Sequence, residues 1–286
     1  MLQLGKFRKY THTTAPLLAA AALLIAFVGV PQLRGQQTQA SPADKNPSRN
    51  SASTRETTRP VTPALVAQTP FAVGEILNYR LLWAIFSNAA AVQLAVVETR
   101  DFFGTPVWHF RASAHSQVPL RSLAVVDDQF DSYADFANLE SRQYETYLDE
   151  MGEKQKTVSR LVAANLAKQG QGSVVLVRRG TRDPLAALYL LRAIDWQRTP
   201  EIRAPVYDGE DLYEMRAHVE GPGETIPIAG SSVRTTKIVV ELFRGGHPSR
   251  TRCSIWFSQD AARLPVLIQA EVPYGSVRAE LVSHIP

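Results

Sequence analysis

Carboxylates gather in one short stretch of the sequence, at Asp127, Asp128, Asp131 and Asp135. Neighbouring carboxylates can act as general acid and base, so an enzyme built on this chain would use them first. If the stretch is a strand, Asp127 and Asp131 share a face but lie about 13 Å apart, too far to share a proton. A calcium loop would need oxygen ligands at alternate positions and a turn glycine, which the stretch lacks. The pattern favours a solvated face, or ion pairs with arginine, over a catalytic pair.

His109 and His115 are the best metal-ligand candidates in the sequence. On one strand they would point to the same face, but their Cα atoms would lie roughly 20 Å apart, so they cannot share an ion. The zinc spacings H-x-x-x-H and H-E-x-x-H are missing from the sequence. Glycine-rich nucleotide-binding loops are missing as well. The sequence therefore predicts neither a metal site nor a cofactor.

The chain has a single cysteine, Cys253, which alternates in phase with Ile255 and Phe257. This pattern predicts a buried apolar side chain rather than a nucleophile. Neither G-x-S-x-G nor S-x-x-K occurs in the sequence. A triad assembled only in space stays open, but these patterns favour a protein that is not an enzyme.

Some aromatic and basic side chains occupy unexpected positions. Trp256 falls on the opposite strand face from Ile255, and Tyr133 and Tyr144 stand in otherwise polar strands. Aromatics on a second face are expected if the sheet encloses a cavity, although packed surface aromatics would give the same pattern. Arg192 lies on an apolar helix stripe, which favours a structural ion pair and leaves a ligand-carboxylate clamp as the alternative. The predicted ligand-binding residues are therefore Tyr133, Tyr144, Arg192 and Trp256.

The elements that must position these residues are mostly strands. Apolar and polar residues alternate in short segments separated by glycine and proline, which predicts a mainly β fold. A curved antiparallel sheet or a partly open barrel follows, with a hairpin turn expected around Asn88. The predicted strands are 77–83, 91–99, 108–115, 123–133, 141–148, 154–161, 173–178, 203–207, 212–219, 234–243, 252–258, 265–272 and 276–282.

One helix is predicted near residues 184–194, with Asp183 as N-cap and Pro184 in the first turn. Leu185, Leu188 and Tyr189 fall on one stripe, so the helix should cover a sheet face or plug a barrel end.

The first 35 residues combine Lys6, Arg8 and Lys9 with an uncharged apolar run at 15–30. This is typical of a secretory signal peptide, with an uncleaved membrane anchor as the alternative. Residues 36–70 are polar and proline-containing, so we expect a disordered linker with a mean reach of roughly 30–35 Å. Residues 71–286 should form a single β-rich domain in the periplasm or cell envelope.

The net charge of +4 comes from the leader, because four of the 31 bases and none of the 27 acids precede residue 36. The remainder is neutral, which argues against a nucleic-acid partner.

Several stretches together resemble the exported bacterial family called domain of unknown function 3108. They are Phe71–Tyr79, Val107–Phe110, Val126–Tyr133, Asp183–Leu185, Tyr189–Arg192, Val206–Gly209 and Ile255–Val266. The resemblance extends over about 71–281, with a departure at Asn88–Ala91, where a glycine is expected. It implies an exported, antiparallel envelope protein and brings no activity, cofactor or catalytic residue. Asp260 and Arg263 are predicted to pair and close a turn.

We expect a non-catalytic module that binds an apolar ligand or lipid. The first alternative is an assembly factor that binds another envelope protein through a sheet edge or face. The second alternative is a hydrolase of an envelope polymer, which would use Asp127, Asp128, Asp131 and a histidine. Membrane contact is expected only through an uncleaved N-terminal segment.

Overall fold

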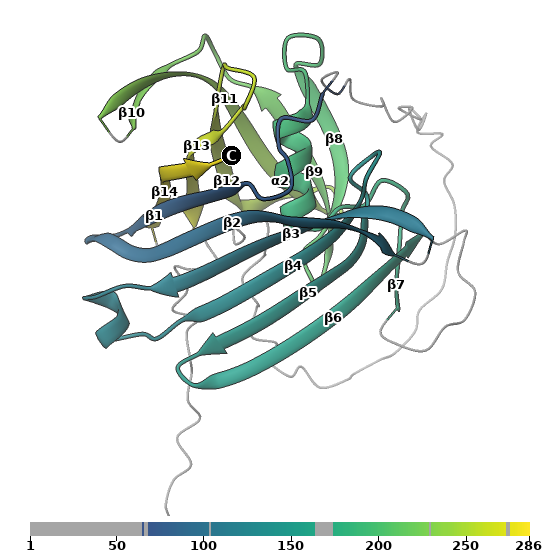
Figure 1. The fold of residues 1–286 in the computed structure, drawn as a ribbon, viewed down its shortest axis with the longest axis horizontal. Coiled ribbons are helices and arrows are strands. Elements are labelled where there is room, and N and C mark those ends of the chain that lie inside the picture. The colour runs from purple at the N-terminus through teal and green to yellow at the C-terminus, as the bar shows by residue number, and fades with distance from the viewer. Residues whose placement is uncertain (1–64, 66–67, 103, 164–173, 229, 273–274) are drawn as a thin grey trace, which may run out of the picture.

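The computed structural model describes residues 65, 68–102, 104–163, 174–228, 230–272 and 275–286 (Figure 1). The predicted leader and most of the predicted linker lie outside the described residues. The strands are β1 (Ile76–Trp83), β2 (Phe86–Phe102), β3 (Thr105–Ser116), β4 (Asp127–Asp135), β5 (Ser141–Glu150), β6 (Glu153–Ala163), β7 (Val174–Val177), β8 (Glu201–Tyr207), β9 (Leu212–Val219), β10 (Thr225–Ile228), β11 (Ser231–Arg244), β12 (His247–Ser258), β13 (Pro265–Val272) and β14 (Gly275–Ile285). The helices are η1 (Leu120–Ser122), a 3₁₀ turn, and α2 (Pro184–Ala193).

The described strands form one large curved sheet in the order β7-β6-β5-β4-β3-β2-β1-β14-β13-β12-β11-β9-β8, with β10 attached to β11. All pairs are antiparallel except β6 with β7. The sheet has two halves, β1–β7 and β8–β14, joined where β1 pairs with β14. Figure 1 shows α2 between the two halves. The mainly β prediction with one helix is confirmed, and the sheet remains open between β7 and β8.

Alternation along each strand decides which side chains face α2. In β1, Leu77, Tyr79 and Leu81 are buried, while Arg80 between them is exposed. We call the α2 side the inner face of the sheet and the opposite side its outer face. The inner face carries the hydrophobic core, since the period-two pattern sends its apolar residues there.

The helix begins where predicted. Asp183 accepts a hydrogen bond from the Ala186 amide at 3.0 Å, and Pro184 occupies the first turn. All ten residues of α2 are buried, so the prediction of one apolar stripe was too narrow. The physical reason is that the curved sheet encloses the helix on more than one side. No helix among the described residues is long and apolar enough to span a membrane.

A short segment before α2 connects the two halves of the sheet. Ser141 of β5 donates its amide to the Thr181 carbonyl at 3.0 Å. Arg182 bonds in both directions to β8, through the Pro205 carbonyl and the Tyr207 amide. Backbone hydrogen bonds therefore bridge the opening between the halves at the start of α2.

Several predicted boundaries differ from the structure: β12, for example, begins at His247 rather than at 252, and β10 was not predicted. Two further differences lie next to the site described below. The first hairpin turns at 84–85 rather than around Asn88, because Trp83 pairs with Phe86 and their rings stack at 6.5 Å. The strand predicted from Leu123 begins at Asp127 instead. Residues 123–126 form no regular strand and follow η1, in which the Leu120 side chain is buried in the core.

Candidate functional site

Three connections of the first half lie at the same end of the sheet. They are the β1–β2 turn, the β3–β4 connection and the β5–β6 turn, which antiparallel pairing places side by side (Figure 1). These connections hold the four most exposed large apolar side chains among the described residues: Ile85 (90%), Val118 (71%), Leu123 (67%) and Met151 (63%). We call these four residues the apolar rim. An isolated exposed apolar residue is ordinary, but four at one end indicate a contact surface.

The β3–β4 connection folds over this end of the sheet, and we call residues 117–125 the capping segment. Its Leu120 and Ala124 side chains are buried in the core, whereas Val118 and Leu123 point to solvent. The Gln117 amide donates to the Ala89 carbonyl of β2 at 2.8 Å, which fixes the start of the segment. The segment is therefore amphipathic, with one side in the core and the other on the apolar rim.

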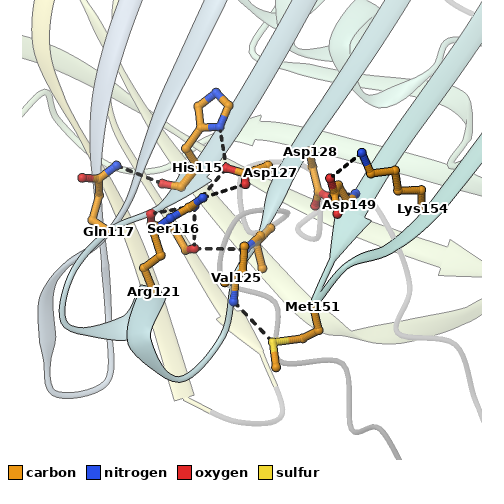
Figure 2. A network of polar contacts seen from close by, with 11 residues as sticks. His115, Ser116, Gln117, Arg121, Val125, Asp127, Asp128, Asp149, Met151 and Lys154 are labelled. Atoms are coloured by element: carbon orange, nitrogen blue, oxygen red, sulfur yellow. Dashed lines mark hydrogen bonds and ion pairs between the residues drawn. The ribbon is translucent and has the colours of Figure 1, made fainter.

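A charged contact holds the capping segment to β4, as Figure 2 shows. Arg121 donates two hydrogen bonds to Asp127, at 2.9 and 2.8 Å. His115 Nδ1 lies 2.9 Å from the same carboxylate. The Arg121 hydrogen bonds lower the pKa of Asp127 to about 2, with a smaller contribution from His115. This pair therefore stays ionised through the whole range of ordinary pH.

The capping segment also reaches the β5–β6 turn (Figure 2). The Val125 amide lies 3.3 Å from Met151 Sδ, and the Met151 amide donates to the Val125 carbonyl at 2.8 Å. Ser116 Oγ accepts the Val126 amide at 3.0 Å. The segment is thus tied to β2 through Ala89, to β4 through Asp127 and to the β5–β6 turn through Met151.

Two acids stand on the inner face behind this segment. Asp128 shares the strand face of Ser132, whose hydroxyl bonds to Asp183 of α2. Burial raises the pKa of Asp128 to about 6, and burial together with the Asp128 charge raises that of Glu150 to about 7. Glu150 stands opposite Val126 in an isolated bridge, so the two acids are near neighbours. The sequence analysis missed Glu150, because only strand pairing brings it beside Asp128.

The other acids of β4 lie on the outer face. Asp131 accepts from Arg111 at 2.8 Å and from Gln129 at 2.6 Å, and His109 Nε2 lies 2.6 Å away. Burial opposes ionisation of Asp131, but these donors outweigh it and lower its pKa. Ion pairs with arginine are confirmed at Asp127, Asp131 and Asp135. Because Asp128 faces inward, the three acids of the hydrolase hypothesis do not meet in one site.

The predicted ligand-binding residues occupy separate environments. Tyr133 lies on the outer face, where its ring stacks with those of His109 and Phe102, at centroid distances of 4.5 and 5.4 Å. Tyr144 is buried on the inner face, where burial raises the pKa of its hydroxyl well above the usual value. That hydroxyl has no hydrogen-bond partner among the described residues.

Arg192, on α2, forms a buried ion pair. Its Nη1 donates to Glu75 Oε2 at 2.6 Å and its Nη2 to Glu75 Oε1 at 2.7 Å. The carbonyls of Pro70 and Ala262 accept further hydrogen bonds from the guanidinium at 2.8 Å. The favoured structural ion pair is confirmed, and the same contacts attach the helix to two distant segments of the chain.

Trp256 lies on the outer face of β12 but is only 6% exposed. Its indole N–H donates to Glu224 at 3.3 Å, and the Lys237 ammonium lies 5.0 Å from its ring centre. Its predicted face is correct, and the segment leading into β10 contributes to covering it. The structure therefore does not bring Tyr133, Tyr144, Arg192 and Trp256 together, and ligand binding by them stays a prediction.

The Asp260–Arg263 pairing was wrong. Asp260 accepts the Ala262 and Arg263 amides at 3.1 Å, which closes the turn. The Arg263 guanidinium instead donates to the Ile194 carbonyl at the end of α2.

No acid–histidine–cysteine cluster suited to a metal ion occurs among the described residues. Cys253 is buried, and burial raises its pKa to about 12, as expected of an inert core thiol. Its predicted role as a small buried side chain is confirmed.

Comparison with known proteins finds one family. A model of the family described as "Protein of unknown function (DUF3108)" matches residues 78–282. None of the curated proteins matches the chain.

Three crystal structures are similar in fold. The first is a β-barrel-like protein of domain of unknown function DUF1849 from Brucella abortus, with 14% identity and a TM-score of 0.46 over 73% of this chain and 94% of that one. The second is a candidate lipoprotein from Parabacteroides distasonis, with 10% identity and a TM-score of 0.34 over 75% and 96%. The third is a candidate exported protein with a YmcC-like fold from Bacteroides fragilis, with 11% identity and a TM-score of 0.28 over 76% and 98%. These structures are too distant to carry a functional argument, which must come from the site.

Proposed function

The chain belongs to the DUF3108 family of proteins of unknown function. Because of its apolar rim, we propose that it binds lipid in the bacterial envelope without catalysing a reaction. The observation that carries the proposal is the position of the four most exposed apolar side chains on three adjacent connections. Side chains at the tips of separate turns can enter a soft lipid surface independently. Moving Ile85 or Leu123 fully out of water would contribute about 1.5–3 kcal/mol each.

The N-terminal sequence supports this assignment. A basic start followed by the apolar run at 15–30 directs the chain to export. If that run is retained as an anchor, a flexible linker of 35 residues holds the domain at a mean distance of roughly 30–35 Å from the membrane. In that case the rim needs only modest affinity, because the tether holds it close to its target.

A single-site fluorescence experiment on the full chain tests the proposal. Cys253 is buried, so an Ile85→Cys variant can be labelled selectively with an environment-sensitive dye. We expect a blue shift on adding phospholipid vesicles, and quenching by brominated lipid. Leu176→Cys is the control, because Leu176 is 54% exposed but lies on β7, away from the rim. Equal responses at the two positions would refute rim-specific binding.

A second candidate function rests on the edge strand β7. Leu176 and Val174 are 54% and 36% exposed, and β7 has a described partner only in β6. An uncovered apolar edge is suited to adding a strand from another protein. Under this alternative, Val175→Pro would abolish a specific crosslink to an envelope partner in cells, while Leu123→Asp would leave it unchanged. Loss of the crosslink only with the rim variant would exclude the edge.

A further inference from the structure

Asp128, which is buried, and Glu150, which is partly buried, form an acid pair on the inner face that lacks a counter-charge. Asp128 is 1% exposed, and its Oδ1 accepts only the Asp149 amide, at 3.1 Å. Its Oδ2 is buried with no hydrogen-bond partner. Directly opposite on β3 stands Ala114, which offers neither a charge nor a donor. A buried carboxylate oxygen without a partner is costly, and it points to a group that the chain itself does not supply.

The bases near this pair are occupied elsewhere. Arg121 and His115 both contact Asp127 on the outer face, and Lys154 lies 3.4 Å from Asp149 (Figure 2). Within the described residues, neither Asp128 nor Glu150 makes an ion pair. The chain thus neutralises the outer-face acids around this end and leaves the inner-face acids open.

The spacing of the two acids suits one small cation. The bridge between Val126 and Glu150 makes Asp128 a diagonal neighbour of Glu150, with Cα atoms about 7–8 Å apart. Carboxylate side chains that lean toward one another across this distance can contact the same cation. A calcium or magnesium ion would want six or more oxygen ligands, whereas an ammonium group has three donors for two carboxylates.

We propose that Asp128 and Glu150 bind the ammonium group of an amphiphile whose apolar tail contacts the apolar rim. This inference rests on the proposed function and deepens it by naming the chemical class of the ligand. The acids and the rim belong to the same end of the sheet, since Glu150 immediately precedes Met151. Opening of the capping segment would give the head group access to Asp128.

Titration calorimetry of the full chain with dodecylammonium, below its micelle concentration, tests the inference. Dodecyl alcohol is the uncharged probe of equal chain length, and propylammonium is the short cationic probe. We expect the wild-type protein to bind dodecylammonium at least tenfold more tightly than dodecyl alcohol. Asp128→Asn and Glu150→Gln should each remove most of that preference, whereas Glu153→Gln, at the exposed first residue of β6, should leave it intact.

The outcomes separate the inference from the proposed function. If the wild-type protein and both variants bound dodecylammonium and dodecyl alcohol with equal affinity, the ammonium site would be refuted. The proposed lipid binding would not be affected by that result. Propylammonium binding as tight as dodecylammonium would show an amine site without an apolar component, which overturns the amphiphile. No binding of any probe, together with no dye response to vesicles, would refute both.

Discussion

Two pairs of charged residues on the inner side of the sheet differ in how their charges are compensated. At the end of α2, Arg192 and Glu75 face each other in two hydrogen bonds, and backbone carbonyls take up further guanidinium donors. At the other site, Asp128 and Glu150 carry like charges and have no paired base among the described residues. The first arrangement stabilises the fold, because each charge is compensated. The like charges of Asp128 and Glu150 lower stability, which makes this pair the stronger candidate for a ligand site.

The largest effect is expected from breaking the compensated site. Arg192→Met removes both guanidinium hydrogen bonds from the buried Glu75 and leaves it only His284 Nε2, 3.2 Å away. Loss of the arginine partner should lower the free energy of unfolding by about 3–5 kcal/mol. Urea denaturation followed by tryptophan fluorescence measures it. Replacing Glu75 by Leu in the same chain should recover much of the loss.

A matched control is Arg203→Met, whose partner Glu201 is exposed and 3.3 Å away. This substitution should lower the free energy of unfolding by less than about 1 kcal/mol. Similar losses for Arg192→Met and Arg203→Met would show that burial does not distinguish the two pairs.

The acid pair Asp128 and Glu150 should make the stability of the protein depend on pH. Burial raises the folded-state pKa of Asp128 to about 6 and of Glu150 to about 7. The folded protein therefore holds these protons more tightly than the unfolded chain does. Stability should fall as pH rises from about 4 to about 7, by up to about 2 kcal/mol for Asp128.

Asp128→Asn removes a titrating group, so its stability should depend less on pH in this range. The charges that act on Asp128 are those of Asp127, Asp149 and His115, and Asp128 in turn acts on Glu150. Urea midpoints of the wild-type and Asp128→Asn proteins, measured at intervals between pH 4 and 8, test this difference in pH dependence. Parallel curves for the wild-type and Asp128→Asn proteins would contradict the burial-induced shift.

A smaller, local effect is expected at the outer-face pair. Arg121→Ala should free the capping segment, so the amides of Leu123 and Ala124, which bond to the Leu120 carbonyl, should exchange hydrogen faster. Arg142→Ala, which removes the Asp135 pair, is the control. Because the pKa of Asp127 is about 2, faster exchange in the wild-type segment should appear only when pH falls below about 4. Unchanged exchange in Arg121→Ala would show that core contacts alone hold the segment.

The smallest effect on stability is expected at the apolar rim. Leu123→Asp changes a side chain that is 67% exposed, so the urea midpoint should stay within error. It should nevertheless reduce the vesicle-induced blue shift of the dye at Ile85→Cys, since a charge opposes entry into lipid. Leu176→Asp should alter neither quantity. A midpoint shift as large as that of Arg192→Met would place Leu123 in the core.

The strand segments and the start of the helix were predictable, because both depend on local chemistry. Period-two alternation marked β1, and the cap at Asp183 marked α2. The turn near Asn88 was misplaced, because stacking of Trp83 on Phe86 is a contact between neighbouring strands. The predicted strand that begins at Leu123 included the end of the capping segment. The apolar residues Leu120 and Ala124, four positions apart, instead favour one turn of helix.

The sequence by itself determined the alternation of faces, the helix, the neutral domain and the expectation that acids of 127–135 pair with arginine. These follow from neighbours within a few residues or from charge alone. Only the tertiary structure decided that Arg192 meets Glu75, 117 positions away, and that Glu150 lies beside Asp128. Alternation tells which residues share a face of one strand. Strand register and sheet curvature bring distant faces together, and they depend on the packing of the whole chain.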